Sequence, residues 1–218
     1  MAAPKVGLRV GEGPPHAGPV DVVDIGIPPF VLDRAAAQPG CARQTTDAAV
    51  RAWWPPRRHD AYKYSVGTAL VVGGAPQYTG APALAARAAA RSGAGYVQCA
   101  CPETVQPTLA GRLSTVPTRA LPADDAGLVP DAALTALAEA LETADALVVG
   151  PGLGRAPGTE AFVRRLVVET SVPLVLDADG LNALADDMDA WAARREAPWV
   201  LTPHAGEFRR LAGEAVDL

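Results

Sequence analysis

Cysteine is scarce in this chain, and the cysteines present form no framework. There are 3 among 218 residues, namely Cys41, Cys99 and Cys101. Their spacing fits neither a disulfide pattern nor a metal-binding motif, which excludes a small disulfide-stabilised secreted domain and a zinc-stabilised fold. We expect the three side chains to behave as small apolar groups in a reducing cytosol.

Long hydrophobic runs and an excess of basic residues are also missing. No apolar run approaches the ~18 residues of a membrane-spanning helix, and the N-terminus lacks the apolar core of a secretory signal. The 19 basic and 24 acidic residues give a net charge of −5, and the basic residues form no large cluster. We therefore expect a cytoplasmic protein with neither a membrane nor a nucleic acid as partner.

The residues that are present predict two regions of different character. Residues 1–60 contain three Pro-Pro pairs and predict only a strand over 20–27 and a short helix over 46–54. From residue 69 onward, short apolar runs alternate with helical patterns, and 49% of the whole chain is apolar. That alternation is typical of right-handed strand–helix–strand units, so we expect an α/β fold with a largely parallel sheet.

The expected elements of this second region follow from β-branched runs, Ala-rich or amphipathic stretches and their glycine boundaries. The expected strands are 69–73, 96–101, 146–149, 174–177 and 199–202. The expected helices are 80–92, 131–143, 159–170, 180–188 and one from 206 onward. Residues 102–130 are rich in proline and predict an irregular stretch.

A glycine-rich loop at 73–81, G-G-A-P-Q-Y-T-G-A, leads from the first expected strand into an Ala-rich helix. Glycine allows close backbone approach, and a helix N-terminus attracts anions. The loop lacks the Gly-Lys-Ser/Thr ending of a P-loop and the spacing of the dinucleotide fingerprint. It predicts either an anion-binding loop or a plain strand-to-helix turn.

The segment G-P-G-L-G at 150–154 directly follows an expected buried strand. Glycines on both sides of a proline predict a rigid turn with exposed N–H groups, suited to a phosphate or an amide. The alternative is a tight exit from the strand that binds nothing.

Two carboxylates and an amide follow the next expected strand, in the motif D-A-D-G-L-N at 177–182. Asp179 suits a helix N-cap. Two carboxylates at this spacing also suit a Mg²⁺ ion that carries a phosphate. Both interpretations stay open: a capped helix, or a phosphate or Mg²⁺ neighbourhood made by Asp177, Asp179 and Asn182.

His204 lies in the motif T-P-H-A-G-E at 202–207, directly after the last expected strand. A single histidine is most often structural. Ligands of open parallel sheets bind outside the carboxyl ends of the strands, however, and two other polar loops end there. This place favours a functional role for His204, whereas His16 and His59 are expected to be surface residues.

Taken in order, five motifs resemble the ADP/ATP-dependent NAD(P)H-hydrate dehydratases, a family of repair enzymes with a ribokinase-like fold. The motifs are Y-T-G-A-P at 78–82, R-S-G-A-G-Y-V at 91–97, G-P-G-L-G at 150–154, D-A-D-G-L-N at 177–182 and L-T-P-H-A-G-E at 201–207. Each is modest alone, but five in this order are specific. The resemblance covers residues 60–218 and implies a largely parallel sheet flanked by helices.

A shorter resemblance lies ahead of it. The segment G-P-V-D-V-V-D-I-G-I-P at 18–28 is similar to the end of the NAD(P)H-hydrate epimerase domain, which in many bacteria is fused ahead of the dehydratase. Together the two resemblances imply a piece of a bifunctional protein. We expect an epimerase tail at 1–30, a Pro-rich linker at 31–60 and the N-terminal part of a dehydratase domain at 61–218.

The resemblance also implies a reaction and its cofactors. Family members remove water from the S epimer of hydrated NADH or NADPH, using ADP in bacteria or ATP in eukaryotes, with Mg²⁺. The nucleotide phosphorylates the hydroxyl of the hydrate, and the phosphate then leaves. Carried over by position, Ala81, Gly152 and His204 would contact the hydrated dinucleotide, with the 177–182 motif near the reacting phosphate. A homo-oligomer, a tetramer in the family, is implied as well.

The family pattern continues past the residues present here. It includes a Lys-Gly segment that helps to hold ADP and a Gly-rich anion hole ending in the aspartate proposed as catalytic base. We expect that aspartate to lie beyond Leu218, the domain to be truncated and the isolated chain to be nearly inactive. Tyr64 also replaces the usual glycine of a Lys-Gly pair in the segment 59–67.

Two other functions remain alternatives. A ribokinase-like small-molecule kinase would use the same fold and stop at a stable phosphorylated product. A non-enzymatic module would only bind or assemble, for example with a complete copy of the protein. A metabolite screen separates the first alternative from the dehydratase, and gel filtration tests the second.

Overall fold

The computed structural model describes residues 5–38, 41, 44–185, 187 and 197–213. The chain divides into two compact units, Met1–Pro56 and Arg57–Leu218. No helix of the described part is both long and apolar enough to cross a bilayer.

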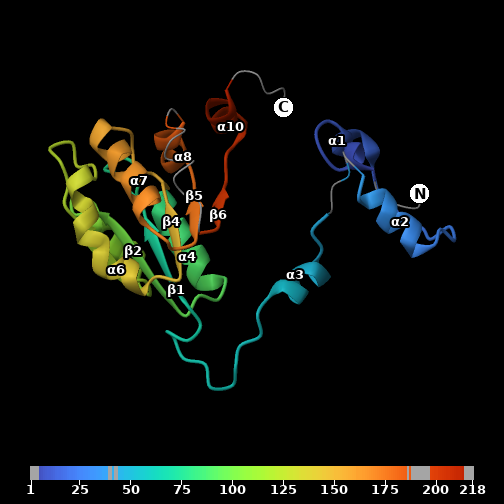
Figure 1. The fold of residues 1–218 in the computed structure, drawn as a ribbon, viewed down its shortest axis with the longest axis horizontal. Coiled ribbons are helices and arrows are strands. Elements are labelled where there is room, and N and C mark those ends of the chain that lie inside the picture. Colours follow the sequence, from blue (N-terminus) through green and yellow to red (C-terminus); the bar gives the residue numbers. More distant parts are fainter. Residues whose placement is uncertain (1–4, 39–40, 42–43, 186, 188–196, 214–218) are drawn as a thin grey trace. The chain divides into compact units, whose positions relative to one another are not determined.

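The first unit consists of short helices joined by loops (Figure 1). They are η1 (Val6–Leu8), α1 (Gly13–Ala17), α2 (Pro29–Ala36) and α3 (Asp47–Trp53). The expected helix over 46–54 is confirmed, and the Thr46 side chain accepts a hydrogen bond of 3.2 Å from the Ala49 N–H. None of the described residues of this unit is buried.

One expectation for the first unit was wrong. Residues 20–27 form no strand, and no strand pairs with them among the described residues. An extended segment needs a neighbour to satisfy its backbone N–H and C=O groups, so β-branched composition alone was insufficient. Helix α2 begins just before the expected linker at 31–60 and extends into it. Pro29 occupies its first turn, where proline costs no hydrogen bond.

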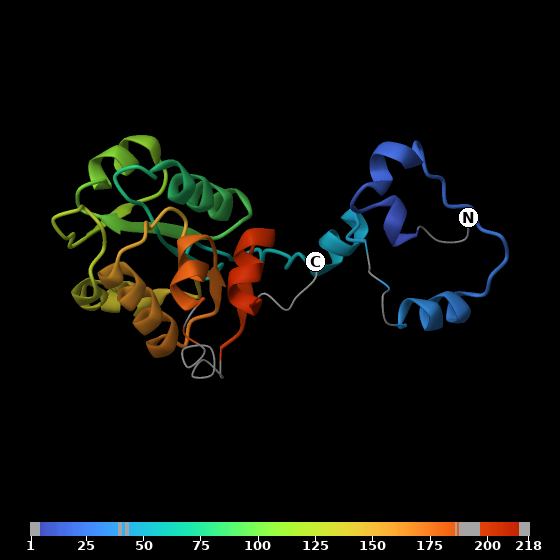
Figure 2. The same ribbon diagram turned by 90° about the horizontal axis from the view of Figure 1, so that it is seen from above.

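The second unit contains a six-stranded sheet in the order β3-β2-β1-β4-β5-β6, visible in Figure 1 and from above in Figure 2. Every pairing is parallel, as the alternating pattern predicted. The strands are β1 (Thr68–Val72), β2 (Tyr96–Pro102), β3 (Thr118–Leu121), β4 (Ala146–Val149), β5 (Leu174–Leu176) and β6 (Trp199–Leu201).

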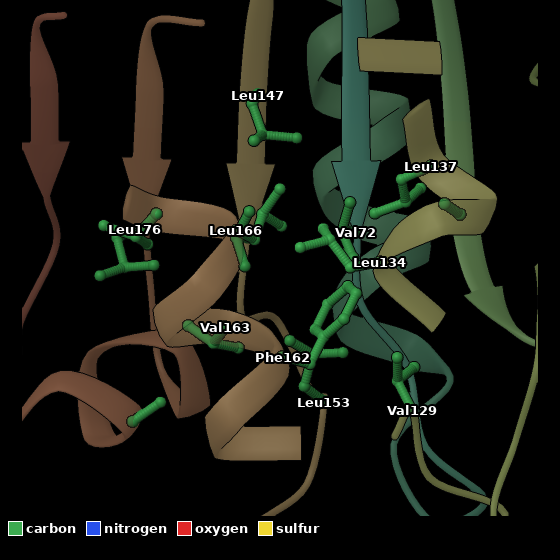
Figure 3. Packing of buried hydrophobic residues seen from close by; sticks show 14 of the residues in the cluster. Val72, Val129, Leu134, Leu137, Leu147, Leu153, Phe162, Val163, Leu166 and Leu176 are labelled. Atoms are coloured by element: carbon green, nitrogen blue, oxygen red, sulfur yellow. The ribbon is translucent and has the colours of Figure 1, made fainter. Parts of the chain in front are cut away.

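Helices cover both faces of this sheet. One core cluster includes residues of α4 (Gly80–Arg91) and α5 (Gln106–Arg112). The cluster on the other face includes residues of η2 (Asp131–Leu137), α6 (Ala138–Thr143), α7 (Pro157–Glu169) and α8 (Asp179–Leu184). Figure 3 shows Phe162, Val163 and Leu166 of α7 pointing into that second cluster. The last helix is α10 (Ala205–Ala212).

The strand order places a topological switch point between β1 and β4. From β1 the chain crosses to β2 and β3 on one side, and it then returns to β4 on the other side of β1. The loops that leave two such strands diverge, and the crevice between them is where α/β folds bind ligands. The glycine-rich loops 73–79 and 150–156 are those two loops.

The expectation of an irregular stretch over 102–130 was wrong. Helix α5 and strand β3 lie within it. Both are short, and β3 is a half-exposed edge strand with an arginine in its middle, so it lacks the continuous apolar run of a buried parallel strand. The expected helix over 131–143 is present but begins as a 3₁₀ helix.

Cys99 and Cys101 are buried in β2, in the cluster beside α4, whereas Cys41 is exposed. Burial, with a smaller effect of Cys101, raises the pKa of the Cys99 thiol to about 12. Burial likewise raises the pKa of the Cys101 thiol to about 11. Both thiols are therefore protonated and unreactive at neutral pH.

A thiol-specific disulfide reagent is therefore expected to modify only Cys41 quickly in the folded chain. All 3 cysteines should react once the chain is unfolded in urea. Rapid modification of more than one thiol under native conditions would contradict the burial of β2. The Cys41→Ser variant is the control, because its folded form should show no fast phase.

Candidate functional site

A cavity of about 640 Å³ opens at the carboxyl ends of the central strands. It brings together Ala81, Gly152 and Asp179 of the predicted site residues, whereas His204, Asp177 and Asn182 do not line it. The complete lining is Gln77, Tyr78, Gly80, Ala81, Gly152, Gly154, Arg155, Ala178 and Asp179. The loops after β1, β4 and β5 thus share one cavity, as expected for a switch-point site.

The two glycine-rich loops are held together by their backbones. The Gly74 N–H donates a hydrogen bond of 3.1 Å to the Pro151 carbonyl. Gly152 has φ +64, and a Cβ there would lie 2.7 Å from the Tyr78 Cβ and 2.8 Å from the Tyr78 carbonyl. Only glycine fits this close approach, so the G-P-G-L-G segment is built for contact between the two loops.

Asp177 and Asp179 each use one carboxylate oxygen to hold a neighbouring loop. The Thr202 hydroxyl donates to Asp177 Oδ1 at 2.8 Å. The Gly154 N–H donates to Asp179 Oδ2 at 2.9 Å. The interpretation of Asp179 as a helix cap was wrong, because α8 begins at Asp179 without a side-chain cap.

The described residues contain no group of three or more His, Cys, Asp or Glu side chains that could hold a metal ion by themselves. Mg²⁺ commonly binds through one or two carboxylates together with the phosphates of a nucleotide. The carboxylates of Asp177 and Asp179 match that donor chemistry. Besides the bond to Gly154, Asp179 accepts a long hydrogen bond of 3.5 Å at Oδ1 from the Asn182 amide.

His204 lies at the N-terminus of α10 and caps it. Its Nδ1 accepts hydrogen bonds from the N–H groups of Gly206 (3.0 Å) and Glu207 (3.3 Å). The Glu207 carboxylate in turn accepts from the His204 N–H at 3.0 Å, which completes a capping box. Because Nδ1 accepts two hydrogen bonds, the proton of the neutral ring is on Nε2, 3.3 Å from Glu207 Oε1. The ring is 68% exposed.

Two arginines that the sequence interpretation missed lie at this site. Arg155 lines the cavity, with its Nε 3.6 Å from Glu160 Oε1. Arg112 donates a hydrogen bond of 3.1 Å to the Thr79 hydroxyl, next to the first residue of α4. Arg155 directly follows the G-P-G-L-G motif, so its position in the sequence was a usable signal. Arg112 had none, because α5 was not expected.

The family of the chain follows from comparison with known proteins. A family model described as NAD(P)H-hydrate dehydratase matches residues 69–218, more than half of the chain. The chain belongs to this family. The match covers the loops after β1, β4, β5 and β6, and with them every predicted site residue.

The full-length relatives that match this chain are named as bifunctional enzymes. The chain is 74% identical over 215 residues to the bifunctional NAD(P)H-hydrate repair enzyme Nnr of Salinibacter ruber, covering 98% of this chain and 40% of that protein. It is 43% identical over 213 residues to the enzyme of the same name from Moorella thermoacetica, covering 98% and 39%. The chain thus spans about two fifths of the length of these curated relatives.

Solved structures agree on the fold. A ribokinase-like superfamily protein from Enterococcus faecalis superposes with a TM-score of 0.57 at 22% identity, over 72% of this chain and 51% of that one. The ADP/ATP-dependent NAD(P)H-hydrate dehydratase from Bacillus subtilis, co-crystallised with ATP/Mg²⁺, superposes with a TM-score of 0.56 at 29% identity. That match covers 76% of this chain and 54% of the other. The second unit has a ribokinase-like fold.

Proposed function

We propose that this chain carries the substrate-binding part of a dehydratase that restores NADH or NADPH from the S epimer of its hydrate, with ADP or ATP as co-substrate. The observation that carries the proposal is the switch-point cavity, in which Ala81 and Gly152 lie in two motifs of the family. We further propose that residues 1–30 are the end of an epimerase-like domain and that residues 31–60 link it to the dehydratase part.

The chemistry of the site fits positioning more than nucleophilic attack. Phosphoryl transfer requires mainly alignment and neutralisation of charge. Backbone N–H groups at Gly152 and at the start of α4 supply dipoles for that purpose, and His204 offers an exposed imidazole in a fixed orientation. Mg²⁺, when bound, would neutralise the charge of the nucleotide phosphates, with Asp177 and Asp179 as the available carboxylates.

The test is to mix the purified 218-residue chain with the S and R epimers of NADPH hydrate separately and to measure binding by calorimetry. Binding that favours the S epimer is expected, and equal or absent binding of both epimers would contradict the proposal. Because the isolated chain is expected to be nearly inactive, ADP and Mg²⁺ are then added to a protein extended past residue 218 with the corresponding segment of a bifunctional relative, which distinguishes the chemistry. Recovered absorbance of the reduced nicotinamide supports the dehydratase, whereas a stable phosphorylated product indicates the kinase alternative.

Arg155 gives a more specific prediction, because it is the basic side chain in the cavity lining. The hydrated dinucleotide carries phosphate groups, so removal of this charge should weaken binding. We expect Arg155→Ala to raise the Kd for S-NADPH hydrate about fivefold, as for loss of one partly exposed charged contact. The Kd should also become less sensitive to salt.

The matched control is Arg87→Ala, an exposed arginine of α4 that does not line the cavity. Its Kd should stay within experimental error of the unmodified chain. An equal effect of the two variants would assign the change to net charge and refute a direct role of Arg155.

We also propose a cytoplasmic homo-oligomer, as the resemblance to the dehydratase family implies. Sedimentation analysis of the chain tests the oligomer: a single monomeric species over a wide concentration range would count against it.

A further inference from the structure

We propose that Asp177 and Asp179 are positioning residues that fix the loops carrying Gly152 and His204, each through one of its two carboxylate oxygens. This inference rests on the proposed function, because it concerns the same substrate site. The D-A-D-G-L-N motif then connects its two neighbouring loops through the hydrogen bonds of Asp179 and Asp177. We call this pair of hydrogen bonds the bracket.

Asp179 holds the loop after β4. Its Oδ2 accepts the Gly154 N–H at 2.9 Å, a charge-assisted hydrogen bond of normal strength and length. Gly154 lies two residues after Gly152, and both line the cavity. The Gly154 N–H consequently points at a carboxylate of this chain and away from any ligand, which leaves the region of Gly152 as the part of the loop presented to substrate.

Asp177 holds the loop after β6 in the same way. The Thr202 hydroxyl donates to Asp177 Oδ1 at 2.8 Å, and it lies 3.3 Å from the Leu176 carbonyl. Thr202 comes two residues before His204, so this bond fixes where the chain leaves β6 and enters the cap of α10. Both carboxylates thus act two residues away from a proposed substrate-binding residue.

The strand order explains why one motif can hold both loops. β5 lies between β4 and β6, so the loop after β5 has the other two loops as its neighbours. Between the two aspartates, Ala178 has φ +49 and ψ −117, the one positive φ among the described residues other than glycine. Such a conformation is strained for an alanine and is kept only where the surrounding structure holds it. The reversal of the chain at Ala178 allows the two carboxylates to serve different loops.

The contacts also limit the metal interpretation to the second oxygen of each aspartate. A Mg²⁺ ion needs the oxygens that face it to be free of N–H and O–H donors, because donors and cations compete for the same lone pairs. Each aspartate here directs one oxygen at a donor of a neighbouring loop. A metal bound through either of these oxygens would have to break a bond that orders the site.

The experiment compares variants that keep the hydrogen-bonding atom with variants that remove it. Asp179→Asn keeps an oxygen that can accept the Gly154 N–H, and Thr202→Ser keeps the hydroxyl that donates to Asp177. We expect both to bind S-NADPH hydrate within about twofold of the unmodified chain. Asp179→Ala and Thr202→Val remove the bonds and should each raise the Kd about five- to tenfold, as for loss of one hydrogen bond to a charged group.

Two further measurements separate positioning from a merely structural role. Asp177→Ala should add almost nothing to the Kd of the Thr202→Val chain, because the two changes remove the same bond, whereas Asp179→Ala should add its full effect. The hydrogen-exchange rate of the Gly154 amide should rise in Asp179→Ala and stay slow in Asp179→Asn, with no ligand present.

Titration with Mg²⁺ alone and with Mg²⁺ plus ADP can contradict the proposal. A large loss of Mg²⁺ affinity in Asp179→Asn, together with an unchanged Kd for hydrate in Thr202→Val, would overturn the proposal in favour of a metal site. If the unmodified chain binds no hydrate, the proposed function fails. The exchange of the Gly154 amide still tests the bracket in that case. Arg209→Ala, an exposed change on α10 outside these contacts, is the control.

Discussion

Replacement of Phe162 by alanine is expected to lower the free energy of unfolding of the second unit by about 3–5 kcal/mol. Phe162 is fully buried on α7 and lies among side chains from the sheet and from η2 (Figure 3). Its truncation removes apolar area from the core, and close packing prevents the surrounding residues from filling the space. Chemical denaturation followed by circular dichroism measures the change.

The matched control for this prediction lies on the same helix. Val168 of α7 is 45% exposed, so Val168→Ala should change stability by no more than about 0.5 kcal/mol. Similar losses in the two variants would mean that α7 is sensitive to helix propensity rather than to packing. Because the chain has two units, the transition should be assigned with a protein lacking residues 1–56 as well as with the whole chain.

The central part of the second unit was predictable because its signals are redundant. The run A-L-V-V at 146–149 is apolar at every position, as a strand covered on both faces must be, and β4 has these bounds. Helix α4 combines high alanine content with glycines at both ends. Gly93, which follows the C-cap Ser92 of that helix, has φ +108, the positive φ that a terminating glycine supplies.

The parts that were missed depend on contacts that no local pattern records. Strand β3 exists because its four residues pair with β2 in register, Cys99 with Thr118, and not because its own sequence favours a strand. The opposite error occurred at residues 20–27, where a β-branched run has no strand beside it among the described residues. Pairing decides strands in both cases, and pairing is not local.

At the candidate site, the sequence identified the loops but not the hydrogen-bond partners of each side chain. The motifs placed Ala81 and Gly152 correctly at one cavity. The partners of the two aspartates came from Gly154 and Thr202, which are 25 residues away from them in the chain. Only the neighbouring positions of β4, β5 and β6 bring those groups together, so residue type and spacing suggested a metal site while geometry favours a bracket.

Gly150→Ala is expected to be among the most damaging single substitutions at this site. Gly150 has φ +119, and a Cβ there would overlap the Asp177 carbonyl oxygen. It would also lie 2.6 Å from the Gly180 N and 2.9 Å from the Gly180 Cα. These atoms are backbone and cannot rotate away, so the end of β4 must separate from the start of α8.

That separation acts on stability and on binding together. We expect a loss of about 3 kcal/mol or more in the free energy of unfolding, since a forbidden backbone conformation and overpacking add. The Kd for S-NADPH hydrate should rise more than tenfold, beyond either single bracket variant, because displacement of the 150–154 loop removes the contact between Asp179 and Gly154 and shifts Gly152 as well. Denaturation and calorimetry on the same sample give both values.

Gly111→Ala is the same chemical change in a place that can accept it. Gly111 lies in α5, has no positive φ and would place its Cβ in open space. In a helix alanine is favoured over glycine by up to about 1 kcal/mol, so this variant should be equal to or more stable than the original chain, with unchanged binding. Opposite signs of the change in the free energy of unfolding for the two variants would show that the close approach of β4 to α8 makes glycine necessary at position 150. A tolerated alanine at that position would instead mean that the loops after β4 and β5 are not held against one another. That result would contradict the proposed positioning role of Asp179.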